Sequence, residues 1–441
     1  MVSPSSPSAP ATPADTGARS APGESDRQRC ALLISQTFPP DPIAVGQYMG
    51  DAAEVLAERG WDVRVLTADR AYENPSERFP GREEKNGVRI RRLPFSSLGK
   101  KTIAHRLVGQ LSFCVQSFLR GLFGPRPDIV LVTTSPPMGG AIGWAISICR
   151  GVPMAYWVMD INPDQAVALG KAKPGSPLVR LFDFANRLVL GRAAVVVALD
   201  RFMAATVKAK RPQMVEPEVI PPWPLEGHLE RVEHADNPFR QAQGWGTDKI
   251  VFMYSGNHSL AHPLETLLDA ARELRDEPRI HFAFIGGGLA KQGVDAEIAG
   301  GAPNLSSLPY QPIERLRESL SAADVHLVSM GAEMVGMVHP CKIYGAMSIG
   351  RPILLLGPAH SHAGEIVQST ECGVQVEHGD VEGCLAAIRA LADEGPGARA
   401  ERGERGREAI DRSLGRSVLA ARFCALLEAA TAEPSGAGSL A

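Results

Sequence analysis

The sequence predicts an α/β protein built from two doubly wound domains, each with a parallel sheet covered by helices. Short apolar runs rich in β-branched residues alternate with longer helical stretches, and the alternation restarts near residue 250. Continuous apolar strands joined by helices are typical of parallel sheets with both faces buried. A proline-rich passage at 220–225 separates the halves, and proline continues neither regular element, so we expect a hinge there.

The expected strands follow in order along both halves. The first half offers runs at 31–35, 61–67, 128–133, 154–158 and 194–198, with a first helix at 47–59. The second half offers runs at 250–254, 280–285, 325–329 and 353–356. We therefore place a first domain at 30–222, a second at 223–415, and a C-terminal helix at 416–432 that returns to the first domain.

Length and composition fit this division. The chain has 441 residues, of which 44% are hydrophobic and 22% charged, as in ordinary folded globular proteins. Residues 1–29 and 433–441 are small and polar, so we expect disordered tails. The longest apolar stretch, 139–149, is shorter than the roughly 20 residues of a spanning helix, and no signal peptide pattern begins the chain.

Cysteine usage and charge suggest a compartment and a kind of partner. Seven cysteines form no C-x-x-C pair, which favours a reducing cytoplasm. The net charge of −3 hides a split, because residues 30–222 hold 24 basic and 17 acidic residues while residues 223–441 hold 19 and 29. A basic half can attract an anionic membrane, a nucleic acid or a phosphorylated acceptor, although a solvated surface has the same composition.

Ligands of open parallel sheets bind beyond the carboxyl ends of the strands. In the first half, Gly46 opens the helix after the first strand, where amides can approach a phosphate closely. Asp160 directly follows the strand at 154–158 and can bind sugar hydroxyls or orient an acceptor. A plain turn and a helix cap are the respective structural alternatives.

The second half has two glycine-containing turns. Gly256 and Asn257 suit a tight turn whose amides contact a diphosphate, with His258 as a hydrogen-bond donor. A capped turn is the alternative, and we expect His262 to face solvent. The run at 286–288 resembles a dinucleotide fingerprint, but Lys291 replaces its third glycine and no acidic residue follows for a ribose. We therefore expect a single nucleotide rather than a nicotinamide cofactor.

The segment 333–352 predicts a loop, a helix from Pro340 to Gly350, and a strand entered through Arg351. Lys342 falls in the first helical turn, where a lone ammonium gains nothing from the helix dipole. A bound diphosphate that uses both amides and cation would resolve this conflict.

Three segments together resemble the GT-B glycosyltransferases of family 4, especially colanic-acid and lipopolysaccharide-type enzymes: Tyr254-Ser-Gly-Asn-His258, Phe284-Ile-Gly-Gly-Gly288 and Pro340-Cys-Lys-Ile-Tyr-Gly-Ala-Met-Ser-Ile-Gly-Arg-Pro352. Phe38-Pro-Pro40 with Gly46, and the segment 160–163, match acceptor-domain loops of that family. The resemblance covers residues 30–430 and implies two Rossmann-like domains facing across a cleft. It also implies retaining transfer of a sugar from a nucleotide diphosphate donor, held mainly by the second domain.

The resemblance implies roles for individual residues. It gives Lys342, Asp160 and Glu333 as catalytic candidates, and as donor-binding candidates Gly46, Gly256, Asn257, His258, Gly286, Gly288, Pro340 and Tyr344. The chain departs from the family where two glutamates stand eight positions apart, since Met337 and Gly345 occupy those positions and Glu333 is the nearest substitute. Many members carry His-Asp where this chain has Met159-Asp160.

We expect neither a metal ion nor a cofactor other than the nucleotide-sugar co-substrate. The chain has no Asp-x-Asp triplet, and paired carboxylates are the usual way to hold a cation that bridges a diphosphate. We then expect Lys342 and backbone amides to stabilise the negative charge that develops on the departing diphosphate.

The helix expected at 103–123 indicates what kind of acceptor the protein binds. Its apolar stripe, flanked by Lys100, Lys101, Arg106 and Arg120, suits either an anionic bilayer or a packed core. We expect a glycan or lipid-linked acceptor, no nucleic acid partner, and a cytoplasmic protein able to attach to the inner face of the plasma membrane. Three alternatives stay open: a nucleotide-sugar epimerase, a transferase for a small metabolite, and a non-catalytic sugar-nucleotide-binding protein.

Overall fold

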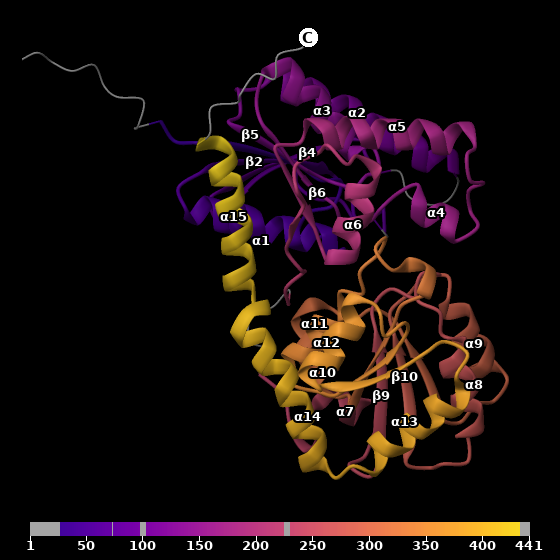
Figure 1. Cartoon of the computed structure of the whole chain (residues 1–441). Coiled ribbons are helices and arrows are strands. Elements are labelled where there is room, and N and C mark those ends of the chain that lie inside the picture. The colour runs from indigo at the N-terminus through magenta and orange to yellow at the C-terminus, as the bar shows by residue number, and fades with distance from the viewer. Residues whose placement is uncertain (1–26, 73, 98–102, 225–229, 433–441) are drawn as a thin grey trace, which may run out of the picture.

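The computed structural model describes residues 27–72, 74–97, 103–224 and 230–432. It shows two α/β domains, one above the other in Figure 1, each with a sheet between layers of helices. The predicted fold class is therefore confirmed. Residues 1–26 and 433–441 of the expected tails, the pair Lys100 and Lys101, and Leu225 of the expected hinge lie outside the described residues.

The first domain has an eight-stranded sheet in the order β3-β4-β2-β1-β5-β6-β7-β8. Its strands are β1 (Cys30–Ile34), β2 (Asp62–Ala68), β3 (Arg82–Lys85), β4 (Val88–Leu93), β5 (Ile129–Thr133), β6 (Met154–Trp157), β7 (Val195–Ala198) and β8 (Glu218–Val219). All neighbours run parallel except β3, which pairs antiparallel with β4 at the edge. The central strands are buried on both faces, which explains why apolar runs revealed them.

Six helices surround this sheet. They are α1 (Ala44–Glu58), α2 (Ile103–Phe123), α3 (Gly139–Arg150), α4 (Asp164–Ala168), α5 (Pro177–Arg192) and α6 (Arg201–Lys210). Two have caps readable from the sequence, because Ser176 accepts from the Val179 amide at 3.4 Å and Asp200 from the Met203 amide at 2.7 Å. Helix α1 begins three residues before the expected position.

The second domain has a six-stranded parallel sheet in the order β11-β10-β9-β12-β13-β14. Its strands are β9 (Ile250–Ser255), β10 (Ile280–Ile285), β11 (Leu305–Leu308), β12 (Val325–Ser329), β13 (Ile353–Leu356) and β14 (Gly373–Val376). The helices are α7 (Pro238–Ala242), α8 (Glu265–Glu273), α9 (Lys291–Ala299), α10 (Leu316–Ser321), α11 (Lys342–Ser348), α12 (His362–Thr370), α13 (Val381–Asp393) and α14 (Pro396–Ala409). Helix α11 begins two residues after the expected start at Pro340, and Gly350 turns the chain after it with a φ of +67°, as expected.

Two expected domain boundaries need correction. Trp223, which we placed in the second domain, packs in the first-domain core, with ring centroids 5.5 Å from Tyr48 and 5.7 Å from Trp157. Its indole nitrogen donates to Asp51 at 2.8 Å. At the other end, Arg27 pairs with Asp128 and Arg29 lies over the Trp61 ring, so these two tail residues contact the first domain.

The chain leaves the second domain through α14, and the C-terminal helix α15 (Arg416–Ala432) then lies along the side of the first domain (Figure 1). Its Phe423 ring lies 4.1 Å from that of Trp157, and Arg416 forms an ion pair with Asp51 at 2.8 Å. Phe423 and Leu427 are buried in the first-domain core. The last helix therefore ties the end of the chain back to the first domain.

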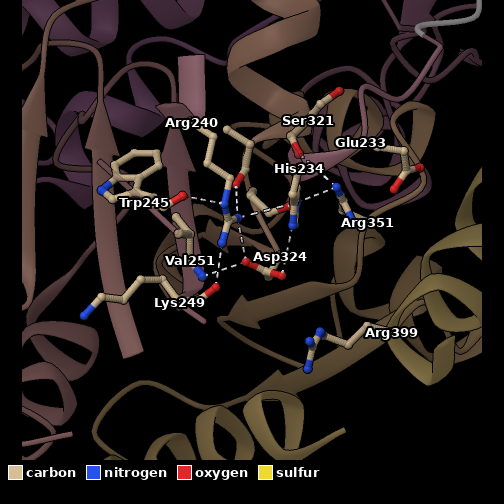
Figure 2. Close-up of polar contacts among 12 residues, drawn as sticks. Glu233, His234, Arg240, Trp245, Lys249, Val251, Ser321, Asp324, Arg351 and Arg399 are labelled. Carbon is tan, nitrogen blue, oxygen red and sulfur yellow. Dashed lines mark hydrogen bonds and ion pairs between the residues drawn. The ribbon is translucent and has the colours of Figure 1, made fainter. Parts of the chain in front are cut away.

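A buried charge network fixes the start of the second domain (Figure 2). The Arg240 guanidinium pairs with Asp324 at 2.9 Å and donates to the carbonyls of Trp245, Gly246, Lys249 and Ala322. Asp324 also accepts from the Val251 amide at 2.9 Å. Arg351 contacts His234 at 2.6 Å and donates to the Ser321 carbonyl at 2.9 Å, so the arginine before Pro352 braces the same segment.

Candidate functional site

Two loops at the carboxyl edge of the second sheet lie side by side. The loop after β9 holds Gly256, Asn257 and His258, and the loop after β10 holds Gly286 to Gly288; we call them the glycine loops. The Gly256 amide donates to Ile285 O at 2.9 Å, and the His258 amide donates to Gly287 O at 2.8 Å. The structure thus brings together the five candidates that we expected in these loops.

Glycine is required here because the loops approach each other too closely for a side chain. Gly286 has a φ of +127°, and a Cβ at that position would lie 2.0 Å from the Gly256 carbonyl oxygen. A Cβ on Gly288, at a φ of +128°, would lie 2.5 Å from His258 O and 2.6 Å from the Asn257 side-chain oxygen. Gly286 is buried between the loops, whereas Gly288 is exposed at this edge, where backbone without a side chain suits close contact with a ligand.

We expect Gly286→Ala to destabilise the second domain more than a matched change at Gly301. Gly301 also has a positive φ, +85°, but nothing lies within 4 Å of the position that a Cβ would take there. The Gly301→Ala change should cost about 1–2 kcal/mol, from the left-handed backbone alone. Gly286→Ala adds a backbone clash and should exceed it by about 2 kcal/mol in urea unfolding. Equal losses would contradict the packing argument.

Lys342 meets the glycine loops from the start of α11. Its Nζ donates to the Tyr254 hydroxyl at 2.5 Å and lies 4.2 Å from the centre of the Tyr254 ring. A Cβ on Gly256 would lie 3.4 Å from the Lys342 Cε, so the side chain passes directly over that glycine. Tyr254 in turn donates to the Asn257 carbonyl at 3.0 Å. Among the described residues, no carboxylate forms an ion pair with Lys342.

The surroundings of Lys342 favour loss of positive charge unless an anion arrives. Burial lowers the pKa of Lys342 to about 7. His258, whose ring lies 4.6 Å from that of Tyr254, has a pKa lowered to about 4, first by burial and then by Lys342. His262 is buried and bonds Ser329 O at 2.6 Å, so our expectation that it faces solvent is wrong. Lys342 is therefore the cation at this site, and the two buried imidazoles are neutral.

A buried polar chain joins the two domains beside this site. His339 contacts the Asp200 carboxylate through Nδ1 and the Tyr344 hydroxyl through Nε2, each at 2.9 Å. Asp200 caps α6 of the first domain, whereas Tyr344 lies in α11. The Ile161 amide also donates to Met337 O at 3.0 Å across the same seam. These contacts fix the segment that leads into Lys342.

Pro340 and Tyr344, two of the donor-binding candidates, lie buried where the two domains contact each other rather than on an open surface. Tyr344 has no exposed surface, and its hydroxyl is taken by His339. Pro340 is also buried, and its carbonyl accepts from the Ile343 amide at 3.1 Å. These positions differ from the donor contacts that we expected, because both residues hold α11 in place from its covered side.

Glu333 lies in a short 3-10 turn (Ala332–Met334) and is exposed. Its neighbour Met334 is buried with Met330, Ala261 and Val338, which anchors the turn. Within the described part of the chain, the Glu333 carboxylate has no hydrogen-bond or ion-pair partner. It is therefore free to accept hydroxyl groups, as the sugar-binding expectation requires.

Gly46 lies in the first turn of α1 and is buried. A Cβ there would lie 2.8 Å from the Phe38 amide nitrogen and 2.9 Å from the Thr37 carbonyl carbon. The close approach that we attributed to phosphates is thus made to the loop after β1. Glycine at this position lets that loop cross over the start of α1.

Asp160 lies at the carboxyl edge of the first sheet, after β6. The amides of Met159 and Asp160 both donate to the Thr134 hydroxyl, at 3.2 Å and 3.1 Å, which fixes the backbone at this position. Burial raises its pKa to about 6. A small pocket here is lined by Asp160, Asn162, Asn186 and Lys210 among others, and Lys210 is neutralised by Asp164 and Asp183 at 2.7 Å and 2.8 Å. The pocket has a volume of only about 20 Å³.

Sequence reasoning missed three contributors to the arrangement. Tyr254, the partner of Lys342, reads as the last apolar residue of a strand. Lys291, which we noted only as a missing glycine, donates to the carbonyls of Gly286 and Leu308 at 2.6 Å each and so braces the second glycine loop. The Asp200–His339 pair links residues 139 positions apart, and its one local signal was the helix cap at Asp200.

The described residues hold no group of three or more His, Cys, Asp or Glu side chains placed to bind a metal ion. They also hold no helix that combines the length and the apolar character needed to cross a membrane.

Comparison with known families supports the two-domain division. Residues 44–223 match the family described as glycosyl transferase 4-like domain, and residues 249–394 match glycosyl transferases group 1. The matches together span most of the chain, and the gap between them contains the segment with the Arg240 network.

One curated protein and two solved structures illustrate what this chain is similar to. The colanic acid biosynthesis glycosyl transferase WcaI of Escherichia coli K12 is 27% identical over 81% of this chain and 91% of its own. Sucrose-phosphate synthase from Thermosynechococcus elongatus has the same fold, with a TM-score of 0.72 at 19% identity, over 92% of this chain and all of that one. HepE of Anabaena, solved with UDP and glucose, has a TM-score of 0.67 at 15% identity, over 91% of this chain and all of its own.

Proposed function

Since the chain belongs to the GT-B glycosyltransferases of family 4, we propose that it transfers a sugar, with retention, from a nucleotide diphosphate donor to a polysaccharide precursor. The glycine loops and Lys342 bind the donor, and Asp160, at the carboxyl edge of the first sheet, contacts the acceptor. The bound UDP of HepE supports a nucleotide donor, and the name of WcaI supports a polysaccharide product.

One observation carries the proposal. The ammonium of Lys342 is withdrawn from water against a tyrosine and a glycine, with no described carboxylate to neutralise it. Structural lysines normally gain a carboxylate when they lose water, because an unpaired buried charge is costly. A lysine that lacks a carboxylate and keeps its charge only when an anion binds beside the glycine loops suits a ligand carrying negative charge.

The proposed chemistry needs placement and charge compensation. Breaking the anomeric C–O bond leaves the electron pair on the nucleoside diphosphate and positive charge on the sugar ring. Lys342 would stabilise the growing charge on the leaving oxygen, and the glycine-loop backbone would fix the phosphates. Glu333, with its open carboxylate, would bind hydroxyls of the sugar or the ribose.

Asp160 would act on the acceptor. With a pKa of about 6 it is mostly ionised at neutral pH and can accept a hydrogen bond from the attacking hydroxyl. Its backbone is held by Thr134 and its neighbour Ile161 by Met337, so both domains set its position. It thus orients the acceptor toward the site of bond cleavage.

Product analysis distinguishes this proposal from the alternatives. A thermal-shift screen with UDP-, GDP-, ADP- and dTDP-sugars identifies the donor, because a ligand that binds only the folded state raises the melting temperature. Incubation with that donor and an oligosaccharide precursor should give a product with the donor's anomeric configuration by NMR. An epimerised or free sugar regardless of acceptor would indicate an epimerase, and binding without turnover a non-catalytic protein.

Donor binding should weaken as pH rises through 7. The free enzyme loses the Lys342 proton near its pKa of about 7, so above that pH the donor must bind together with a proton. The Kd should then rise by up to tenfold per pH unit between pH 7 and 8.5, in calorimetric titrations with an uncleaved nucleotide sugar. Lys342→Arg stays charged and should flatten this profile. An identical slope in that variant would assign the titration to another group.

A further inference from the structure

The Tyr254 side chain lies between the core of the second domain and Lys342. Tyr254 is the penultimate residue of β9 and is fully buried. Its ring packs with those of His258 and Phe284, whose centroids lie 4.6 Å and 6.4 Å away. Tyr254 and Phe284 belong to the same buried cluster, so the core of the domain sets the position of the Tyr254 hydroxyl.

The hydrogen bonds of this hydroxyl have a fixed direction. A tyrosine hydroxyl donates one hydrogen bond and accepts others, whereas an ammonium only donates. Tyr254 donates to the Asn257 carbonyl at 3.0 Å, so its lone pairs accept from Lys342 Nζ at 2.5 Å. Burial raises the pKa of Tyr254, so the hydroxyl keeps its proton. Tyr254 therefore links the ammonium to the first glycine loop without adding a charge.

Both contacts between Tyr254 and Lys342 favour the charged lysine. Burial lowers the pKa of Lys342 to about 7, and a hydrogen bond donated by the ammonium opposes that effect. The Tyr254 ring, whose centre lies 4.2 Å from Nζ, attracts the same charge. The hydroxyl also restricts a long side chain, whose ordering otherwise opposes binding. A diphosphate would then meet an ammonium that is already charged and in place beside Gly256.

Other titratable groups surround Lys342 and Tyr254 in the described part of the chain. They are His258 and His262 after β9, Lys291 of α9, Tyr310 after β11, Cys341 before α11, and Asp160 of the first domain. Burial lowers the pKa of both histidines and raises that of Cys341 to about 12, so these three side chains are neutral at pH 7. The Lys291 ammonium donates to two backbone carbonyls. Asp160, with a pKa of about 6, acts on Cys341 from across the domains.

We infer that Tyr254 is a positioning residue for the transfer: its hydroxyl holds the Lys342 ammonium charged and beside Gly256 until a diphosphate binds, and so sets the upper pH limit of donor binding. The inference rests on the proposed function and adds to it the residue through which the core controls the cation. Tyr254 acts through Lys342 and does not contact the donor. Because the hydroxyl favours the charged lysine, its removal should matter only at a pH where the lysine can lose its proton.

Tyr254→Phe tests this role, since it keeps the ring beside Lys342 and removes the hydroxyl alone. In ligand-free protein labelled with ¹³C at lysine Cε, NMR should show a Lys342 pKa that is lower in the variant by about one pH unit, which corresponds to one hydrogen bond to a charged group. Lys342→Arg identifies the signal by removing it. An unchanged titration of Lys342 in Tyr254→Phe would overturn the inference.

Donor binding gives a second readout, which a general loss of structure would change differently. At pH 5.5 Lys342 is charged in both proteins, so their Kd values for an uncleaved nucleotide sugar should agree within twofold. At pH 8 the variant should bind about tenfold more weakly than wild type, because less of its Lys342 is protonated. Weakening by the same factor at both pH values would mean a merely structural role and would overturn the inference. Asp160 titrates in both proteins, so its effect cancels in the comparison.

Two further variants serve as matched controls. Tyr156→Phe removes a buried hydroxyl from β6 of the first domain and should bind the donor as wild type does at both pH values. In Lys342→Arg, which stays charged, adding Tyr254→Phe should cause no pH-dependent loss, and a loss that persists there would overturn the inference. A wild type that binds no nucleotide sugar would remove the proposed function, while the titration of Lys342 in ligand-free protein would still decide the role of Tyr254.

Discussion

Replacing Lys342 by methionine should lower kcat/KM roughly 100- to 1,000-fold while leaving the protein as stable as wild type. The loss follows because the ammonium would stabilise charge that grows on the leaving diphosphate, and single preorganised donors at such positions have effects of about this size. Stability should hold because the ammonium has a tyrosine hydroxyl and ring as partners but no described carboxylate. Methionine keeps the length of the stem over Gly256, so packing is preserved.

Steady-state kinetics and melting curves on the same preparation check the predicted loss of kcat/KM and the predicted unchanged stability. Lys208→Met is the matched control, since Lys208 pairs with the exposed Glu216 on the far domain and should change neither value. The melting temperature of both variants should stay within about 2 °C of wild type. A stable Lys342→Met enzyme with full turnover would mean that the lysine takes no part in the reaction.

Replacing Arg240 by methionine should produce the largest loss of stability, about 3–5 kcal/mol. The change leaves Asp324 as a buried carboxylate without its cation and removes the donors of four backbone carbonyls. At about 2–4 °C per kcal/mol, the melting temperature of the second domain should fall by about 6–20 °C.

The control for Arg240 is an arginine in an exposed pair. Arg279 pairs with Asp393 at 2.8 Å, and both side chains are more than half exposed, so Arg279→Met should change stability by less than about 0.5 kcal/mol. Calorimetric melting compares the two variants directly. Similar shifts for both would mean that the network in Figure 2 does not hold the start of the second domain.

The sequence predicted the parallel strands well because their signal is local. Strands β5, β9 and β10 are buried along nearly their whole length, so each reads as an unbroken apolar run. Strand β4, the second strand from the edge of its sheet, alternates exposed arginines with buried aliphatic residues, and the edge strand β14 is half-exposed and begins at a glycine, so both were missed. Strands at or next to an edge carry too little apolar pattern to be recognised alone.

The site was predicted in part, for a similar reason. Glycine loops after strands are visible as short motifs, and the structure brings Gly256, Gly286 and Lys342 together. The direction in which a side chain points depends on partners distant in sequence. Tyr344 bonds His339, which in turn contacts Asp200 of the other domain, and Trp223 packs against Tyr48, which is 175 positions earlier in the chain.

Lys342 and the glycine loops are proposed to bind the diphosphate of an activated sugar. The most direct measurement is the Kd of the cognate nucleoside diphosphate against its parent nucleoside, for wild type and Lys342→Met at pH 6.5. Wild type should prefer the diphosphate by 100-fold or more, and the variant should lose at least tenfold of that preference while binding the nucleoside as before. A preference of equal size in both proteins would contradict the claim.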